Sequence, residues 1–348
     1  MIKKSKLLAG LLTGAMVASV LAGCGSTTTN DGKDGADDGK IVIGLSLPTQ
    51  REERWVRDKE AMETAAKDAG VELLVQVSDT DTAMQASQVE NLLSQNIDVL
   101  ILAPVDGAAA AASVKKAHDA GIKVISYDRL IMNTDVDLYL SFDNEKVGEL
   151  QGEYITKLVP KGNYIVMAGA PTDNNATLFK KGAMKFIQPL VDSGDIKVVT
   201  DLAVDNWEPN NALKIVENAL TANDNDVQAI LAPNDGTAGA AISALAAQGL
   251  DGKIPVTGQD SELTAAQRIV EGTQSMTIFK DTRELGKAAI ADAIKMAKGE
   301  EVSTNGVTNN STMDVPSDLL TPIVVDKDNI DANLIDSGYM KHDDVYAK

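Results

Sequence analysis

Short apolar runs that alternate with longer helical patterns are the feature that most constrains the fold of this chain. The first five runs are rich in Val, Ile and Leu and cover residues 41–47, 71–77, 98–103, 123–127 and 138–142. Helical patterns fill intervals between them, at residues 53–69, 82–95 and 108–120. Strands that are apolar almost throughout are buried on both faces, as in parallel sheets covered by helices. The alternation therefore predicts βαβ units and a doubly wound parallel sheet, which is an α/β fold.

The same pattern restarts in the second half of the chain. The later runs cover residues 164–168, 197–203, 228–232, 255–258 and 275–278. The sequence of residues 103–109 is similar to that of residues 232–238, and each segment follows an apolar run. We expect Asp106 and Asp235 to cap the helices that follow. A chain of 348 residues is long enough for two domains with their own cores. We predict two equivalent α/β lobes, with convergence of two unrelated βα units as the alternative.

Polar and aromatic side chains gather where the predicted strands end. In open parallel sheets ligands bind beyond the carboxyl ends of the strands, and two facing lobes would line one cleft with these ends. The residues there are Arg54, Trp55, Asp128, Arg129, Asp173, Asn175, Trp207, Asn234, Asp260 and Lys280. Sugar hydroxyls both donate and accept, so planar Asp, Asn and Arg groups suit them, and indoles can cover the C–H faces of the ring. The set predicts a sugar site, although each polar residue alone could instead be a loop cap or a surface ion pair.

Several other functions are disfavoured by composition and motifs. A formal net charge of −19 argues against a nucleic-acid-binding protein, which needs a positive surface. Two His and one Cys cannot supply a His/Cys metal cluster or a disulfide framework, so we expect no metal and no cofactor. The chain has neither a G-x-S-x-G nor a G-x-G-x-x-G motif. Asp128, Asp173 and Asp260 could form a glycosidase pair, but each has a closer use as a hydroxyl acceptor, so we expect no enzyme.

The N-terminal residues have the pattern of a secretion signal. Lys3, Lys4 and Lys6 precede an apolar stretch at residues 7–20, which is shorter than the ~20 residues of a spanning helix. Leu21-Ala22-Gly23-Cys24 then matches a bacterial lipoprotein signal, with the only Cys of the chain at the lipidation position. We predict a signal peptide at residues 1–23 and a lipidated Cys24 with a flexible tether at residues 24–39. The protein would be extracytoplasmic and anchored to the membrane by this lipid; the alternative is a free Cys after an ordinary signal peptide.

Longer motifs connect the chain to a known family. They are Glu53-Arg54-Trp55, Tyr127-Asp128-Arg129, residues 141–151, residues 173–176, residues 211–215, Gly258-Gln259-Asp260, residues 272–277, residues 314–317 and Leu320-Thr321-Pro322. In these motifs the chain resembles the sugar-binding proteins of bacterial ABC importers, of the ribose/galactose type with the periplasmic-binding-protein type I fold. The likeness is greatest to the D-xylose-binding members and covers about residues 40 to 340.

This resemblance implies two doubly wound parallel-sheet lobes, joined by a three-strand hinge and closing on a ligand by hinge bending. We expect crossings near Asp143, Asp281 and Ser311. The N-terminal lobe would then be residues 40–142 plus 281–310, and the C-terminal lobe residues 143–280 plus 311–348. A monomer is the expected oligomeric state.

The resemblance also implies roles for the residues at the strand ends. Trp55 and Trp207 would pack on the faces of D-xylose. The residues that would hydrogen-bond the sugar are Arg54, Asp128, Arg129, Asp173, Asn175, Asn234, Asp260 and Lys280. Lys180 is a further candidate that stands where we expect an Arg near the pocket, and its ammonium cannot make the bidentate bond of a guanidinium.

The implied partner is the permease of an ABC importer, to which the protein would deliver a monosaccharide. A xylose sensor that presents its closed form to a membrane histidine kinase would have the same pocket and is the alternative. A sugar-responsive repressor also has the same core, but it needs a basic helix-turn-helix where this chain has a signal segment and an acidic tether.

Overall fold

The computed structural model describes residues 39–347. The predicted signal peptide, Cys24 and residues 25–38 of the predicted tether lie outside the described residues. From Lys40 onward the chain forms one compact unit. Within residues 39–347, no helix is both long enough and apolar enough to cross a bilayer.

The first lobe of this unit is built on a seven-stranded sheet with the order β10-β11-β5-β4-β3-β1-β2. Its strands are β1 (Val42–Leu47), β2 (Glu72–Val77), β3 (Val99–Leu102), β4 (Lys123–Tyr127), β5 (Leu138–Phe142), β10 (Gly306–Asn309) and β11 (Asp314–Leu320). Neighbouring strands are parallel except for β10 and β11. The helices of this lobe are α1 (Glu53–Ala69), α2 (Thr82–Ser94), α3 (Ala111–Asp119) and α9 (Thr282–Ala297).

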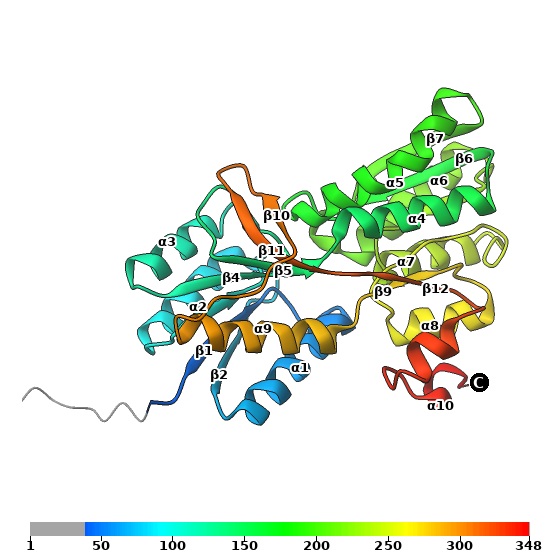
Figure 1. The fold of residues 1–348 in the computed structure, drawn as a ribbon. Coiled ribbons are helices and arrows are strands. Elements are labelled where there is room, and N and C mark those ends of the chain that lie inside the picture. The colour runs from blue at the N-terminus through cyan, green and yellow to red at the C-terminus, as the bar shows by residue number, and fades with distance from the viewer. Residues whose placement is uncertain (1–38, 348) are drawn as a thin grey trace, which may run out of the picture. The chain divides into compact units, whose positions relative to one another are not determined.

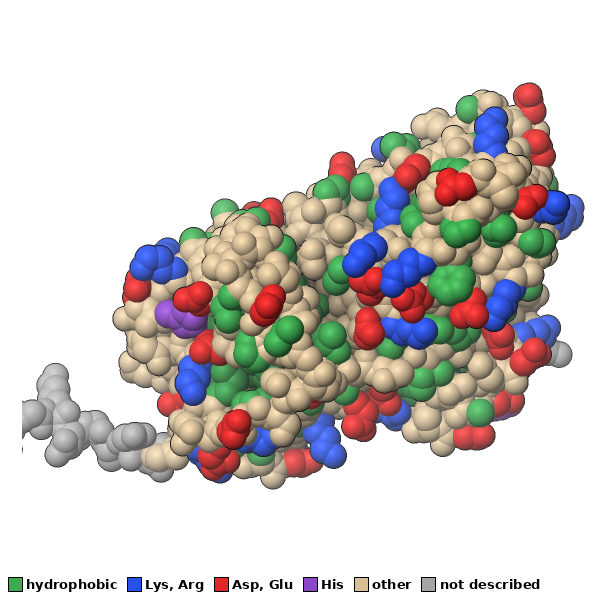
Figure 2. Space-filling view, turned by 45° about the horizontal axis from the view of Figure 1, so that its top comes forward, with side chains coloured by type: hydrophobic (Ala, Val, Ile, Leu, Met, Phe, Trp, Pro, Cys, Tyr) green, Lys and Arg blue, Asp and Glu red, His purple; other side chains and the backbone are tan. Residues whose placement is uncertain are grey.

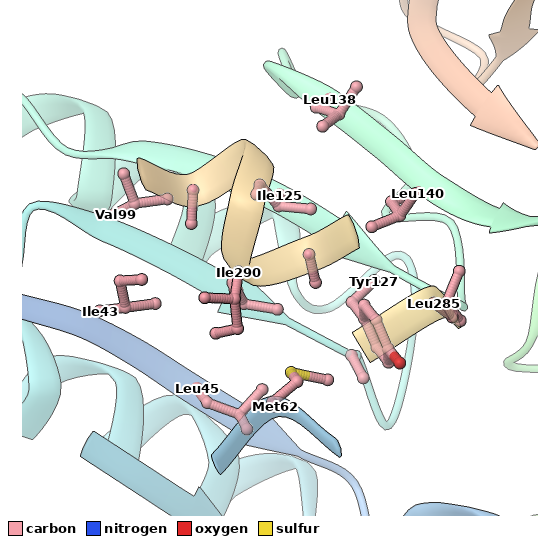
Figure 3. Close-up of a cluster of buried hydrophobic side chains, with 14 of the residues drawn as sticks. Ile43, Leu45, Met62, Val99, Ile125, Tyr127, Leu138, Leu140, Leu285 and Ile290 are labelled. Atoms are coloured by element: carbon pink, nitrogen blue, oxygen red, sulfur yellow. The ribbon is translucent and has the colours of Figure 1, made fainter. Parts of the chain in front are cut away.

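Helices cover both faces of the first sheet. On one face, Met62 of α1 and Ile290 of α9 pack against the apolar side chains of β1, β3, β4 and β5 (Figure 3). On the other face, Val89 of α2 and Val114 of α3 belong to a second buried cluster with residues of the same strands. Strands buried on both faces explain the nearly continuous apolar runs and confirm the predicted doubly wound arrangement.

The second lobe repeats this plan with shorter strands. Its parallel sheet has the order β7-β6-β8, and a separate antiparallel pair joins β9 to β12. These strands are β6 (Gly162–Ala168), β7 (Ile196–Ala203), β8 (Ala229–Leu231), β9 (Thr277–Phe279) and β12 (Ile323–Val325). The helices are α4 (Asn144–Leu158), α5 (Asn174–Asp192), α6 (Pro209–Ala222), α7 (Asp235–Ala246), α8 (Leu263–Glu271) and α10 (His342–Val345), with short turns of 3₁₀ helix at Asp205–Trp207 and π helix at Asp331–Ile335.

The strand expected at residues 255–258 is reduced to one parallel bridge between Val256 and Ile230. Pro255 has no N–H to donate, so the ladder there is short. The bridge nevertheless extends the sheet beyond β8, as β4 extends the first sheet beyond β3.

Polar side chains begin many of the helices, because they accept hydrogen bonds from free N–H groups of the first turn. Such caps are Asp81, Asp143, Asp173, Asn234 and Asp281. The predicted cap at Asp235 is wrong, because Asn234 caps α7 and Asp235 is its first residue. Asp106 accepts bonds from two N–H groups of the following turn, but α3 begins only at Ala111.

Three segments pass between the lobes (Figure 1). The topology puts two of them between β5 and α4, at Asp143, and between β9 and α9, at Asp281. The crossing predicted near Ser311 is wrong, because β11 pairs with β5 in the first lobe and the chain leaves that lobe only after Leu320. Ser311 lies instead in the turn between β10 and β11, with a φ of 74°. The first lobe therefore extends to residue 320, and the second lobe resumes with β12.

Candidate ligand-binding site

Ten of the eleven predicted ligand-binding residues line one cavity between the two lobes, with a volume of about 30 Å³. The first lobe contributes Glu52, Arg54, Trp55, Asp128 and Arg129. The second lobe contributes Asp173, Asn175, Phe179, Trp207, Asn234, Gln259, Asp260 and Lys280. All ten residues that we selected at the strand ends are in this set. The two predicted sheets therefore do present their carboxyl ends to a common space.

Arg54 is the central cation of the first lobe. It lies in the first turn of α1, where its Nη1 donates to Asp128 Oδ2 at 2.7 Å. Behind it, Nε and Nη2 both donate to Asp58 Oδ2, at 3.0 and 2.7 Å. Asp58 is one helical turn further along α1 and accepts a bond from the Tyr127 hydroxyl as well. Burial raises the pKa of Asp58, and the charge of Arg54 only partly offsets this rise. The bonds to Asp58 therefore orient the Arg54 guanidinium without help from a ligand.

Asp260 and Lys280 form the matching pair in the second lobe. Lys280 Nζ lies 2.9 Å from Asp260 Oδ1, as an ion pair without hydrogen-bond geometry. Across the cavity, Lys280 Nζ is 3.9 Å from Asp128 Oδ2, and Arg54 Nη1 is 3.8 Å from Asp260 Oδ1. Burial alone would raise the pKa of Asp128, but the charges of Arg54 and Lys280 outweigh burial and lower it. Each buried charge therefore has an opposite charge beside it, as buried ions require.

The two carboxylates have an unusual backbone in common. Asp128 has a φ of 59° and Asp260 a φ of 93°, in the region that side chains other than glycine rarely adopt. Asp128 is held there by its N–H, which donates to the Leu140 carbonyl at 2.8 Å, and by the Ser141 hydroxyl, which donates to the Asp128 carbonyl at 2.7 Å. The Asp260 N–H donates to the Ile278 carbonyl at 2.9 Å. Two equivalent strained turns, one in each lobe, thus place an acid at the cavity, and such strain is common at functional sites.

A second ion pair joins the lobes directly. Arg129 Nε lies 2.9 Å from Asp173 Oδ2, and the Trp207 indole Nε1 donates to the same oxygen at 3.2 Å. The other oxygen of Asp173 caps α5 by accepting from the Asn175 N–H at 2.9 Å. Burial raises the pKa of Asp173, and Arg129 offsets part of this rise. Asp173 therefore has a structural and a cavity-facing role at the same time.

Aromatic rings form the flat walls of the cavity. Trp55 is contacted by the guanidinium groups of Arg54 and Arg129, at 4.3 and 5.3 Å from a ring centroid. Trp207 meets Phe179 edge to face, with centroids 6.4 Å apart. A Cβ at Gly169 would lie 2.0 Å from Trp207, so the close approach of the indole requires glycine there.

The two Asn residues are oriented by the protein. Asn175 Nδ2 donates to the Asp128 carbonyl at 3.0 Å, which ties α5 of the second lobe to the strained turn of the first. Asn234 Oδ1 accepts from the Thr237 N–H at 3.0 Å as the cap of α7. Since the cap uses this oxygen, Nδ2 is the group that Asn234 offers to the cavity.

Lys180 is not brought to this site. Asn175 and Phe179 are four residues apart and share the cavity-facing side of α5, whereas Lys180 is turned away by the helical period. Its Nζ pairs with Asp201, at the surface, and 34% of its side chain is exposed. The expectation that Lys180 lies at the pocket is therefore wrong.

Glu52, Phe179 and Gln259 line the cavity but were not selected from the sequence. Phe179 lies inside a helix, where an apolar residue is indistinguishable from a core residue. Gln259 precedes Asp260 as Tyr127 precedes Asp128, so the similarity between the two halves of the sequence could have identified Gln259 as a candidate. Glu52 precedes Arg54 by two residues, but in the sequence it resembles any charged residue at a helix start.

The chemistry of the cavity suits a neutral ligand with many hydroxyls. Its lining carries the cations Arg54, Arg129 and Lys280 against the carboxyl groups of Glu52, Asp128, Asp173 and Asp260. Within the part of the chain that the structure describes, no group of three or more His, Cys, Asp or Glu side chains is placed to hold a metal ion. On the face shown in Figure 2, acidic and basic side chains are interspersed, and no continuous basic surface is present there.

Ligand entry requires the lobes to separate. The charged residues of the cavity are at most 11% exposed, including Arg129 at its rim. The lobes are also joined by the Gly107 N–H, which donates to the Thr172 carbonyl at 3.0 Å, and by the Leu263 N–H, which donates to Glu53 Oε2 at 2.7 Å. A sugar can therefore reach the cavity only by a movement about the three crossing segments.

Comparisons with known proteins agree with this arrangement. A family model described as a periplasmic binding protein domain matches residues 43–301. A D-xylose-binding periplasmic protein from Haemophilus influenzae is 47% identical over 306 residues, covering 88% of this chain and 92% of that protein. The D-xylose-binding periplasmic protein from Escherichia coli is 46% identical over 306 residues, covering 88% and 93%.

Among solved structures, a carbohydrate transporter solute binding protein from Chloroflexus aurantiacus in complex with D-glucose has a TM-score of 0.82 and 37% identity, with 88% of this chain and 98% of that chain covered. The resemblance inferred from the motifs and the predicted fold class are both confirmed.

Proposed function

Because this chain belongs to the periplasmic binding protein domain family, we propose that it is an extracytoplasmic solute-binding protein that takes a monosaccharide, D-xylose, into the interlobe cavity and delivers it to an ABC importer. The family consists of binding proteins, which agrees with the expectation that the chain is not an enzyme. The names of the two D-xylose-binding relatives support the choice of sugar.

The observation that carries the proposal is the ring of paired charges enclosed by aromatic walls. Each half of the ring belongs to one lobe, with Arg54 and Asp128 in the first and Asp260 and Lys280 in the second. A pyranose hydroxyl can donate to a carboxylate and accept from a cation at once, so several hydroxyls can bridge the two halves. Such bonds stabilise the closed arrangement only when the sugar is present, which is the state that a transporter has to recognise.

The balance of positive and negative charges in this ring favours a neutral ligand over a charged one. An anionic ligand would be repelled by the carboxylates, which are already paired with the cations of the cavity. A cationic ligand would be repelled by Arg54, Arg129 and Lys280. A neutral polyol leaves the buried pairs intact and only adds hydrogen bonds to them.

We propose further that lipid on Cys24 holds the protein at the membrane. The support is the sequence itself: Lys3, Lys4 and Lys6, the apolar residues 7–20 and the Leu21-Ala22-Gly23-Cys24 motif. One acyl-modified Cys followed by a hydrophilic tether would keep the binding unit beside a permease without a spanning helix.

Isothermal titration calorimetry with D-xylose, D-glucose, D-ribose, L-arabinose and D-galactose tests the proposal. We expect D-xylose to bind with the highest affinity. Binding of another sugar of the set in preference to D-xylose would overturn the specificity, and binding of none would overturn the sugar-binding function.

A further inference from the structure

Glu52 has a buried oxygen that no protein group satisfies. It precedes α1 as the N-cap residue, but its side chain makes no capping bond to that helix. Only 8% of Glu52 is exposed, and its Oε2 is buried without a hydrogen-bond partner. An unpartnered carboxylate oxygen is costly to bury, so its position in the wall of the cavity indicates a ligand group that bonds to it.

The other oxygen of Glu52 belongs to a contact between the lobes. Arg51 Nε donates to Glu52 Oε1 at 2.9 Å. The same guanidinium reaches the second lobe, where Nη1 donates to Glu208 Oε2 at 2.9 Å and Nη2 to the Asn206 carbonyl at 2.8 Å. We call Arg51, Asn206 and Glu208 the interlobe clasp. Asn206 directly precedes Trp207, so the clasp lies beside the aromatic wall of the cavity.

We propose that Glu52 is a further sugar-binding residue, whose Oε2 accepts a hydrogen bond from a ligand hydroxyl while Oε1 holds Arg51 in the interlobe clasp. This inference rests on the proposed sugar-binding function of the site. It makes one carboxylate a link between the ligand and a contact that keeps the lobes together.

Gln259 supplies a second acceptor of the same kind on the opposite lobe. Its Nε2 donates to the Pro233 carbonyl at 3.1 Å, which fixes the other end of the amide as the oxygen. That oxygen, Oε1, is buried without a partner and belongs to a residue that lines the cavity. Two free acceptors favour a ligand that donates hydrogen bonds, such as a sugar with free hydroxyls, and disfavour a sugar acid.

Calorimetry on Glu52→Leu and Glu52→Gln with D-xylose and its monodeoxy derivatives tests the inference. A hydrogen bond to a charged group is expected to contribute about tenfold to hundredfold in affinity, so Glu52→Leu should weaken D-xylose binding by about that factor. Glu52→Gln retains one acceptor oxygen and should lose less. One monodeoxy sugar should bind the wild type weakly and show no further loss with Glu52→Leu, because it lacks the hydroxyl that Glu52 contacts.

Arg51→Ala separates contact with the ligand from an effect through the clasp. Arg51 and Glu208 have side chains that are 32% and 35% exposed, so the clasp alone should change the affinity only severalfold. If Glu52 touches the sugar, Glu52→Leu should still weaken binding in the Arg51→Ala background. Loss of its effect in that background would overturn the contact with the ligand.

Three further outcomes are decisive. The sugar-free melting temperature of Glu52→Leu should change little, because the change removes an unsatisfied buried oxygen together with the bond to the partly exposed Arg51. A large fall would assign Glu52 a structural role and overturn the inference. Wild-type protein that binds no sugar of the panel would refute the proposed function and this inference with it. Wild type and Glu52→Leu that bind D-xylose equally would refute the inference alone.

Discussion

Replacing Asp260 by Asn tests the charged ring with the least disturbance of shape. Asn tolerates the positive φ of 93° at this position better than Ala does, so the backbone turn should persist. The change removes the carboxylate that lies 2.9 Å from Lys280 Nζ and 3.8 Å from Arg54 Nη1. At an effective dielectric constant of about 20, these attractions are on the order of 6 and 4 kcal/mol before the cost of desolvation is subtracted.

For binding, the relevant loss is the charge assistance of each bond from Asp260 to a sugar hydroxyl. Bonds to charged groups contribute about 1.5–3 kcal/mol and neutral bonds about 0.5–1.5 kcal/mol, so each bond should weaken by about 1–2 kcal/mol. The Kd for D-xylose should therefore rise about 5- to 30-fold, as measured by calorimetry. The sugar-free melting temperature should also fall, because Lys280, which is 3% exposed, loses its nearest partner.

Two additional variants make this test specific. Lys280→Met in the Asp260→Asn background removes the buried cation that has lost its nearest partner and should restore part of the melting temperature without restoring the affinity. Asp201→Asn makes the same chemical change at the exposed partner of Lys180 and should leave the Kd unchanged. Wild-type affinity in Asp260→Asn would refute the reasoning, because it would show that the carboxylate does not contact the sugar.

Four other outcomes are expected. Lys180→Ala should change the Kd for D-xylose less than twofold, because Lys180 pairs with Asp201 outside the cavity; a tenfold loss in calorimetry would contradict this placement. Cys24→Ser should move the protein from the membrane fraction to the soluble fraction, and retention after a high-salt wash would contradict the lipid anchor. D-xylose at about 100 times its Kd should stabilise the folded protein by about 2.7 kcal/mol, seen as a higher melting temperature in calorimetric scans. Burial, with the nearby Asp235 and Asp260, raises the pKa of Glu262 to about 8, so the folded protein holds a proton that the unfolded chain releases near pH 4.5. The melting temperature should therefore fall as the pH rises from about 4.5 to about 8 and level off above, and Glu262→Gln should flatten this dependence.

The fold was predictable where the hydrophobic pattern is strong. Each strand of the first sheet that is buried on both faces appeared in the sequence as an apolar run, and helices filled the intervals. The third crossing was not predictable in this way, because β10 is largely exposed, with Val307 64% exposed, and β11 has only a short alternation of buried and exposed residues. Whether β11 continues one lobe or begins the next depends on its pairing with β5, which lies far away in the sequence.

The site was predictable to the extent that it follows from topology. Strand ends of one parallel sheet share an edge, so residues such as Asp128 and Asp260 could be grouped without knowledge of any distance. Residues that reach the cavity from inside an element were not predictable by this rule. Phe179 reaches it from the second turn of α5, and the adjacent Lys180 does not, because one residue along a helix turns a side chain by about 100°.

The distribution of ion pairs over the two lobes explains how the site can open and still remain organised. Arg54 pairs with Asp128 inside the first lobe at 2.7 Å, and Lys280 pairs with Asp260 inside the second at 2.9 Å. The corresponding contacts across the cavity are longer, at 3.8 and 3.9 Å. Separation of the lobes therefore breaks neither of these two short pairs, although it does break the direct pair between Arg129 and Asp173. Sugar hydroxyls that bridge the halves supply the short bonds that Arg54, Asp128, Asp260 and Lys280 do not make to one another across the cavity, so closure of this ring depends on the ligand more than on direct contacts.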